Sequence, residues 1–452
     1  ATPFSFADFP LLLNPIAGLL LAIINVLAFA AFLYGLSYFD EYKENGLGAM
    51  GLFMNLFIAS MNVLVVADNA FWFLVFFELM SLTSYFLVVV EQKKQSIKGG
   101  FMYLVMAHVG FLMIMISYFI MASQTGSFEF AAYRVHDFGP ALGSLAFVLA
   151  FFGFGCKAGM VPFHSWLPQA HPAAPSNVSA LMSGGMIKIG VFGIIKVGLD
   201  LLSGTDCMLW WGLLVLVVGA VSSVLGVVYA LGEHDIKKLL AYHSVENIGI
   251  VALFLGFGGP LGIAAALLHC VTHGLTKSFL FCLSGNVLMK YGTRDLNEIS
   301  GVLKAMPATG VLLAMGFFAL AGFPPFAMFV SEITGITAGV MDGRWIVLAI
   351  FVIALTIVVA ACAHVVTAAV FGKVPDHIKK GDVGVAALVP EIILAVTLLW
   401  FGVAAPQPML QCVEDATGIV TQSSTEALHE TPVVNILFSQ TDGASAGMKV
   451  ER

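Results

Sequence analysis

Several long apolar runs of this sequence are interrupted by ionisable residues, and these residues are the ones most able to do chemistry. A charged side chain at the centre of a bilayer costs at least about 2.5–3.5 kcal/mol on insertion scales. We therefore expect such side chains to face one another or internal water rather than lipid. The set comprises Glu78, His108, Lys157, Lys188, Lys196, His269, His273, Lys277, Glu332 and His364.

The chemistry that these residue types favour is proton transfer. Desolvation lowers the pKa of a lysine and raises that of a glutamate, whereas a nearby opposite charge reverses both shifts. A buried lysine beside a movable glutamate can therefore hold a proton in one state and release it in another. Arginine would stay charged, and no arginine lies within an apolar run.

The lysines differ in their position within the runs. Lys188 lies in the middle of its run, where the side chain cannot reach the headgroups, and we expect a functional role there. Lys157, which comes shortly before Pro162, is expected to have a similar role. Lys196 lies near the end of its run, so its side chain can extend toward the headgroups.

Two histidines and a lysine share a helical spacing. His269, His273 and Lys277 are four residues apart, which stacks them along one face of a helix. A pair of histidines at this spacing can bind zinc, but no third ligand is evident in the sequence. We favour a titratable chain, and a packing role remains the other alternative.

Other polar residues in the runs give weaker signals. His108 and His364 are isolated on apolar faces, which is typical of hydrogen-bonded core histidines. His243 and Glu246 lie near the start of a helix, where they could be interfacial or could form a point of proton uptake. The sequence does not decide between these two alternatives.

The composition requires elements that hold these residues inside a membrane. The 452 residues are 59% hydrophobic and only 10% charged, with a net charge of −7, whereas a soluble domain is about 25% charged. A soluble enzyme, a nucleic-acid binder and a disordered scaffold are thereby excluded. The six cysteines have no CxxC spacing, and no Gly-rich phosphate loop is present, so the sequence contains no visible source of energy.

The apolar runs predict an all-α polytopic membrane protein with about twelve transmembrane helices, because each is near the length that crosses a bilayer. The fifth run is followed at once by Pro162, and the tenth is interrupted by Pro324 and Pro325. Proline disrupts a helix, and freed backbone groups need protein or water at membrane depth. Broken helices lining water are therefore predicted at both places. The expected spans are 14–37, 47–66, 70–90, 99–121, 140–161, 177–199, 207–229, 236–256, 260–289, 307–340, 345–371 and 385–404.

Basic residues predict the orientation of these helices. If the loops alternate sides, the opposite loops hold only Arg134 and Arg344, and the other basic loop residues gather on one side. The positive-inside rule then places that side in the cytoplasm of a multi-pass inner-membrane protein. The residues on it are Lys43, Lys93, Lys94, Lys98, Lys237, Lys238, Lys290, Arg294, Lys304, Lys373, Lys379 and Lys380.

The ends of the chain differ from its apolar body. We expect a polar N-terminal segment at 1–13, a transmembrane domain at 14–404 and a tail at 405–452 that is mobile or extends laterally. The chain opens with Ala1 rather than Met, so a preceding segment is expected to be missing.

Several motifs carry a family resemblance. The stretch 154–176, the residues from Ser179 to Lys188, and the segments 235–242 and 269–277 contribute, as does the Phe-Pro-Pro break before Glu332. Together they resemble the proton-conducting antiporter-like subunits of respiratory complex I, Mrp-type antiporters and membrane-bound hydrogenases. The chain is most similar to the membrane subunits of hydrogenase-4 and formate hydrogenlyase-type complexes. Residues up to about 235 resemble component B, and those beyond resemble component F.

The resemblance implies a fold. The family has fourteen core helices, of which the two N-terminal ones are missing here, and two inverted five-helix repeats with one broken helix each. The first repeat would span about 47–199 and the second about 207–340, with flanking helices at 345–404.

The resemblance also implies roles for residues along a mid-membrane hydrophilic axis. Glu78 would modulate Lys157, Lys188 would link to it and to a cytoplasmic half-channel, and Glu332 would be the terminal relay. The implied proton-translocation residues are Glu78, Lys157, Lys188, His269, His273, Lys277 and Glu332. The implied partners are other membrane subunits and a peripheral redox arm with nickel–iron and iron–sulfur centres, none of which this chain would bind.

Three functional hypotheses follow. The preferred one is a proton-translocating subunit of a redox-driven oxidoreductase complex, because moving one charge against 100 mV costs about 2.3 kcal/mol and needs a driver. The second is a secondary Na⁺/H⁺ antiporter, which is disfavoured because only Glu78 and Glu332 are evident membrane acids. The third is a structural membrane anchor. Quinone oxidation by this chain alone is least favoured.

Overall fold

The computed structural model describes residues 9–205, 210–431, 434–435 and 438. Over these ranges the chain is almost entirely helical, and its only β-type pairings are isolated bridges. Eleven of the described helices are long and apolar enough to cross a membrane. The all-α polytopic prediction is therefore confirmed. Cys207 and the first residues, including Ala1, lie outside the described ranges.

The expected runs correspond one by one to observed helices. The tenth run differs, because it divides into two helices that are each too short to be counted among the eleven long ones. The other eleven expected spans each correspond to one long helix. In the first half the helices are α1 (Pro15–Tyr38), η1 (Phe39–Asn45), α2 (Leu47–Val66), α3 (Ala70–Val88), α4 (Lys94–Thr125), α5 (Phe130–Arg134), α6 (Gly139–Ala158), η2 (Phe163–Trp166), α7 (Leu167–Ala173), α8 (Ser176–Leu181), η3 (Met182–Met186), α9 (Ile187–Ile195) and η4 (Lys196–Leu201). In the second half they are α10 (Trp211–Leu231), α11 (Ile236–Phe257), α12 (Gly259–Tyr291), α13 (Val302–Ala305), α14 (Pro307–Leu320), α15 (Ala327–Met341), α16 (Trp345–Val365), η6 (Val366–Val370), α17 (Val385–Val403), α18 (Gln407–Thr421) and α19 (Glu426–Glu430).

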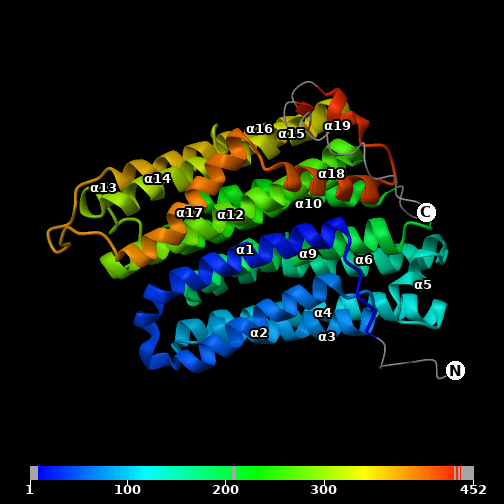
Figure 1. Ribbon diagram of the computed structural model, residues 1–452, viewed down its shortest axis with the longest axis horizontal. Coiled ribbons are helices and arrows are strands. Elements are labelled where there is room, and N and C mark those ends of the chain that lie inside the picture. Colours follow the sequence, from blue (N-terminus) through cyan, green and yellow to red (C-terminus); the bar gives the residue numbers. More distant parts are fainter. Residues whose placement is uncertain (1–8, 206–209, 432–433, 436–437, 439–452) are drawn as a thin grey trace.

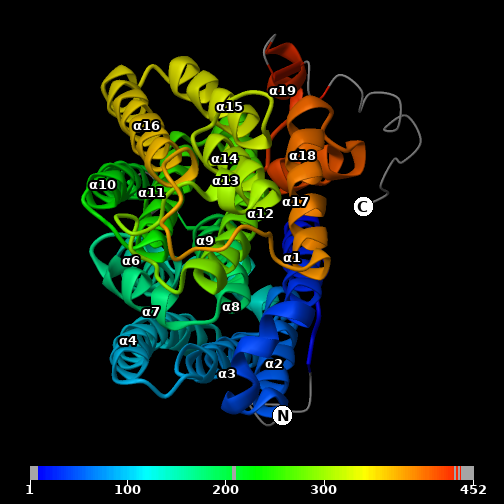
Figure 2. The same ribbon diagram turned by 90° about the vertical axis from the view of Figure 1, so that its left-hand side faces the viewer.

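The long helices run in roughly one direction, which is horizontal in Figure 1. One end of the bundle carries the loops 39–46, 89–93, 291–306 and 372–384, and we call it the basic end. The other end, which we call the opposite end, carries α5 and α19. Viewed along the helices in Figure 2, α2–α4 lie at one extreme and α15 and α16 toward the other, with α8, α9 and α12 between them.

The central helices carry most of the predicted site residues, and they are almost wholly buried. Every residue in the most apolar windows of the segments 176–201 and 259–291 is inside the protein. Polar residues on these helices therefore have no access to lipid, and any solvent they meet is internal. This burial explains how one hydrophobic chain can retain several charged groups at membrane depth.

Both predicted helix breaks are present, and each adjoins a predicted site residue. Helix α6 ends at Ala158, directly after Lys157, and the chain resumes helical structure only at Phe163. Helices α14 and α15 are separated by residues 321–326, shortly before Glu332. The C-terminal end of a helix carries partial negative charge, so the end of α6 favours a cation at Lys157.

Gly159 ends α6 in a left-handed conformation, with φ of +79°. A Cβ atom at this position would also contact the side chain of Leu167. We expect Gly159→Ala to lower the free energy of unfolding by at least about 1 kcal/mol, because an L-residue is disfavoured at such a φ. Thermal unfolding in mild detergent would measure this. The matched control is Gly48→Ala, where a Cβ meets open space in helix α2 and stability should not fall.

The segment from residue 405, expected to be a mobile tail or a lateral extension, contains a packed helix. Helix α18 lies against α1 and α12 and buries Leu410, Val413 and Val420. These apolar residues recur at helical spacing, which is the signal in the sequence that predicts a helix here. Residues 432–433, 436–437 and 439–452 lie outside the described ranges.

Candidate functional site

Lys157 is buried between α3, α4 and α6, and hydroxyl groups rather than a carboxylate surround its ammonium. Its Nζ donates to Ser81 Oγ at 2.9 Å and to Tyr103 Oη at 2.8 Å. Tyr103 Oη is in turn 2.6 Å from Ser84 Oγ. The side chain is 1% exposed. Neutral oxygens can accept from a charged lysine without fixing its charge, so this site can gain or lose a proton.

Glu78 does not form an ion pair with Lys157 in the described part of the structure. Its Oε1 instead lies 2.9 Å from His108 Nε2, and its Oε2 is buried without a hydrogen-bond partner. Glu78 still interacts electrostatically with Lys157. The expectation that His108 is a core histidine is wrong, because its side chain is 44% exposed on the outer face of α3 and α4.

Lys188 contacts one of the two histidines of α12, His273, directly. Its Nζ lies 2.7 Å from His273 Nδ1 and donates to the Ser183 carbonyl at 2.6 Å. The rings of His273 and His269 are parallel, with centroids 6.3 Å apart. All three side chains are fully buried. The structure therefore brings three of the predicted site residues into one row.

The row continues into residues that the sequence alone leaves undecided or gives no reason to single out. His269 Nε2 lies 3.1 Å from Asn247 Oδ1, and Asn247 Nδ2 donates to Glu246 Oε2 at 2.7 Å. His243 Nδ1 contacts the same Glu246 oxygen at 3.1 Å. In the sequence, the only sign of this polar site was the adjacent polar pair Glu246-Asn247 within an otherwise apolar run. It is buried inside the protein, so the interfacial alternative for His243 and Glu246 is wrong.

Lys277 and Glu332 lie beside this row. Among the described residues, neither side chain is hydrogen-bonded to a member of the row. Lys277 Nζ donates to the Leu240 carbonyl at 2.7 Å and interacts electrostatically with Glu246. The Glu332 carboxylate lies against Gly322 in the helix break and lines a pocket of about 310 Å³. Its neighbour in sequence, Ser331, contacts His269 Nδ1 at 2.9 Å.

The described hydrogen bonds keep the Lys157 group apart from the Lys188 row, and within the row the pair Lys188–His273 meets His269 only through the parallel stacking of the two rings. The Lys157 group approaches the segment that carries Lys188 through the contact of Tyr103 Oη with Met186 Sδ at 3.6 Å. Several buried ring nitrogens near the row have no hydrogen-bond partner, including His273 Nε2 and His243 Nε2. Buried polar atoms of this kind are usually satisfied by internal water. Water at these atoms would extend the row.

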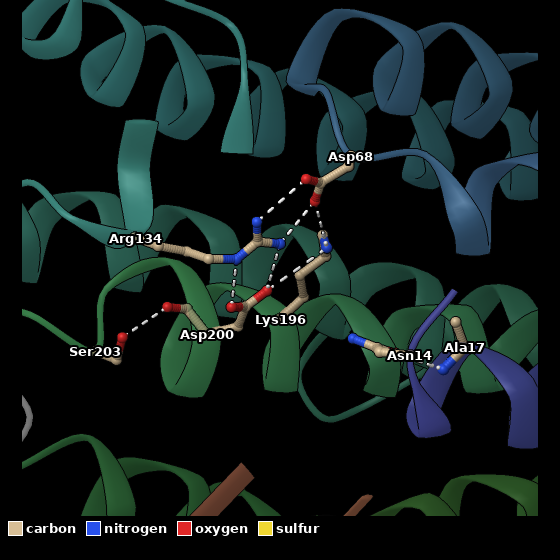
Figure 3. Close-up of polar contacts among 7 residues, drawn as sticks. All are labelled: Asn14, Ala17, Asp68, Arg134, Lys196, Asp200 and Ser203. Carbon is tan, nitrogen blue, oxygen red and sulfur yellow. Dashed lines mark hydrogen bonds and ion pairs between the residues drawn. The ribbon is translucent and has the colours of Figure 1, made fainter. Parts of the chain in front are cut away.

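Lys196 belongs to a different site, shown in Figure 3. The expectation that it extends toward the headgroups is wrong, because its side chain is 5% exposed and lies 3.6 Å from Asp200 and 3.9 Å from Asp68. Arg134 bonds to both carboxylates at distances from 2.6 to 3.1 Å. Burial opposes the charge of Arg134, but its hydrogen bonds to Asp68 and Asp200 keep the pKa of its guanidinium above the usual value.

The acid count from the sequence was also too low. The expectation that only Glu78 and Glu332 are membrane-embedded acids is wrong, because Glu246 on α11 and Glu391 on α17 are both buried. Glu391 accepts from Asn286 Nδ2 with both oxygens at 2.8 Å. His364, expected as a core histidine, is exposed on α16. Within the described residues, no group of three or more His, Cys, Asp or Glu could hold a metal ion.

If this row transfers protons, we expect Glu246→Gln to slow that transfer roughly tenfold, the effect of about one pKa unit in the coupling between two titrating groups. Glutamine has the same shape, and it removes the carboxylate that acts on Lys277 and accepts from Asn247. The rate would be measured with a pH-sensitive dye in vesicles that contain the assembled complex. Glu41→Gln at the exposed basic end is the control. An unchanged rate would remove Glu246 from the path.

Comparison with known proteins gives consistent similarities. The profile described as NADH:quinone oxidoreductase/Mrp antiporter, transmembrane, matches residues 67–358, which include all seven predicted site residues. Hydrogenase-4 component B of Escherichia coli (strain K12) is 48% identical over 343 residues, 74% of this chain and 51% of the relative. A match of that length extends beyond residue 235 into the second half. Formate hydrogenlyase subunit 3 of the same organism is 32% identical over 339 residues, 73% of this chain and 54% of the relative.

A solved structure agrees at the level of the fold. A chain of the Mrp complex from Dietzia sp. DQ12-45-1b superposes with a TM-score of 0.82 at 22% identity, covering 95% of this chain and 87% of that one. The chain spans about half the length of the curated relatives named above. The matched region of the family profile includes both helix breaks and the row of buried ionisable residues.

Proposed function

Because the chain belongs to the NADH:quinone oxidoreductase/Mrp antiporter family of membrane proteins, we propose that it carries protons across the membrane within a redox-driven complex. The observation that carries this proposal is the buried row Lys188–His273–His269–Asn247–Glu246. Each member except Asn247 can bind or release a proton. Lys188 and Lys277, which are both 0% exposed, have no carboxylate within 4.0 Å among the described residues.

The proposed path begins at the basic end, which we take as the cytoplasmic side, and runs through the middle of the bundle. Lys157, with Glu78 beside it, would gate the first half, and the row from Lys188 would carry the proton into the second half. Lys277 and Glu332 would complete the path toward the opposite end. The two helix breaks support this layout because they interrupt the helical hydrogen bonding next to Lys157 and Glu332, and backbone groups freed in this way need protein or internal water at membrane depth.

We further propose that the first repeat covers about 47–199 and the second about 207–340, with flanking helices at 345–404. The driving chemistry would lie in other subunits of a hydrogenase- or complex I-type assembly. In that assembly, nickel–iron and iron–sulfur centres would sit in a peripheral redox arm.

A neighbouring membrane subunit is proposed to cover the outer face of α3 and α4. Glu78 and His108 are partly exposed there at mid-helix, among exposed apolar side chains such as Val75 and Val105. Lipid cannot solvate such a pair, so a protein surface with polar groups is the suitable cover. We expect a photoreactive probe on Val105→Cys to cross-link to another subunit. The same probe on Val221→Cys, on helix α10, should react mainly with lipid.

The experiment that tests the function uses the assembled complex in proteoliposomes with a pH-sensitive dye. We expect acidification that requires the redox donor and does not require sodium. Sodium-dependent proton movement without any donor would instead support the antiporter hypothesis. That second candidate gains support from the two additional buried acids, Glu246 and Glu391, since carboxylates are oxygen ligands that hard cations prefer. Normal assembly with no proton movement would leave only the role of a membrane anchor.

A further inference from the structure

Three buried tyrosines of the first transmembrane segment take no part in the proposed path. Tyr34, Tyr38 and Tyr42 are four residues apart, so they lie on one face of the segment formed by α1 and η1. None of their side chains is more than 6% exposed. A buried tyrosine hydroxyl needs a polar partner, and three in a row place a line of hydroxyls inside the protein.

The line reaches the surface at the basic end. Tyr42 Oη donates to Glu91 Oε1 at 3.3 Å, and Tyr38 Oη lies 3.5 Å from Tyr42 Oη. Glu91 lines a pocket of about 370 Å³ together with Ser96, Thr293 and Arg294. This pocket gives the hydroxyl line a polar opening.

At its inner end the line meets a buried acid. Tyr34 Oη donates to Asn286 Oδ1 at 3.1 Å, and Asn286 Nδ2 donates to both oxygens of Glu391. Glu391 is 0% exposed and has no cation within 4.0 Å among the described residues. An uncompensated buried charge is costly, so a carboxyl in these surroundings is suited to holding a proton.

The two halves of the line come together at Gly285 of α12. Tyr38 Oη donates to Ser176 Oγ at 3.2 Å. A Cβ atom on Gly285 would contact both Ser176 Oγ and Tyr34 Oη, so these two oxygens converge on one point. No hydrogen bond joins Tyr34 Oη to Tyr38 or Ser176 among the described residues, and Gly285, which has no side chain, leaves the two oxygens facing the same point.

We propose that this line is a proton-uptake path from the basic end to Glu391, which acts as a proton-loading site for α12. The inference rests on the proposed function and deepens it. Helix α12 also carries Lys277, nine residues before Asn286 and roughly 13 Å along the helix at 1.5 Å per residue. The path therefore passes Asn286, on the helix that carries the central lysine, before it ends at Glu391 on α17. The groups that act electrostatically on Glu391 are Asp382, Tyr34 and Cys282.

The test uses the assembled complex in inverted vesicles, with the initial rate of redox-driven acidification as the first readout. We expect Glu391→Gln to slow this rate at least about tenfold, since a positioned acid–base group contributes a factor of that order or more. Tyr38→Phe should slow it as well, because phenylalanine lacks the hydroxyl. The matched controls are Glu298→Gln, which is exposed, and Tyr133→Phe, which loses a hydrogen bond to a backbone carbonyl elsewhere.

The second readout is infrared difference spectroscopy, which a purely structural role would leave unchanged. A carboxylic-acid carbonyl band that responds to redox drive in the wild type should be lost in Glu391→Gln. If that variant fails to assemble, Tyr38→Phe and Gly285→Ala decide the matter, because both leave the carboxyl in place. If both variants acidify the vesicles at the wild-type rate, the uptake path is wrong. The proposed function is tested separately, by Lys188→Met. If the wild-type complex moves no protons, both proposals fail.

Discussion

Lys188→Met is expected to abolish redox-driven proton translocation while the complex still assembles. The Lys188 ammonium is the only titratable group that the described structure places within hydrogen-bond distance of His273. Methionine has a similar length and no proton to give, so the row loses its first member without a large change in volume. The expected loss is at least a hundredfold, within the range attributed to a positioned proton donor, about 10²–10⁴.

Lys188→Arg separates charge from proton transfer. Arginine keeps the positive charge but stays protonated, so an electrostatic role would survive this change and a relay role would not. We expect the arginine variant to be nearly as inactive as the methionine variant. Lys43→Met, at an exposed position of the basic end, is the control. Acidification rates and the amount of assembled complex would be measured together, and full activity in Lys188→Arg would contradict the relay.

The sequence predicts the helices well because their causes are local. Runs of apolar residues and the prolines at 162, 324 and 325 are visible without any tertiary structure, and both breaks appear where these prolines lie. Lys188 and the two histidines of α12 were also recognisable, because an ionisable residue in the middle of an apolar run is costly unless it has an internal partner. Their mutual contact, however, joins two helices far apart in the chain.

Several of the errors arose because the sequence does not show which residues meet in the fold. The prediction for Lys196 used its distance from the end of a run, yet Asp68 and Asp200 hold it inside the protein. His108 looked isolated in the sequence, yet Glu78 lies on the neighbouring helix. Glu391 lies in the expected span 385–404 and was not singled out from the sequence. Its neighbours Asn286 and Tyr34 come from two other helices.

The tyrosine line shows the same limitation in another form. Tyrosine is common in apolar helices and carries no charge, so a spacing of four residues gave no reason to assign a function. A function for the tyrosine line can be inferred only from the structure, in which Tyr42 contacts Glu91 and Tyr34 contacts Asn286, the partner of Glu391.

Arg134→Met is expected to destabilise the protein more than any other single change at the opposite end. Arg134, at the end of α5, donates four hydrogen bonds to Asp68, between α2 and α3, and to Asp200 in η4. Removing the guanidinium leaves two carboxylates with only Lys196 for compensation. Breaking a buried ion pair costs about 3–5 kcal/mol. The low end, roughly 3 kcal/mol, applies here because the Arg134 side chain is 24% exposed.

A second substitution can show that the loss comes from uncompensated charge rather than from lost packing. Asp200→Asn alone removes one carboxylate that Arg134 and Lys196 share, and it should destabilise the protein by itself. In the Arg134→Met background the same change removes one of the stranded charges, so the double variant should be more stable than the sum of the two losses predicts. Thermal unfolding in mild detergent would give the four midpoints of this cycle. Simple additivity would show that the two residues do not interact, and the ion cluster would then have no part in holding these segments together.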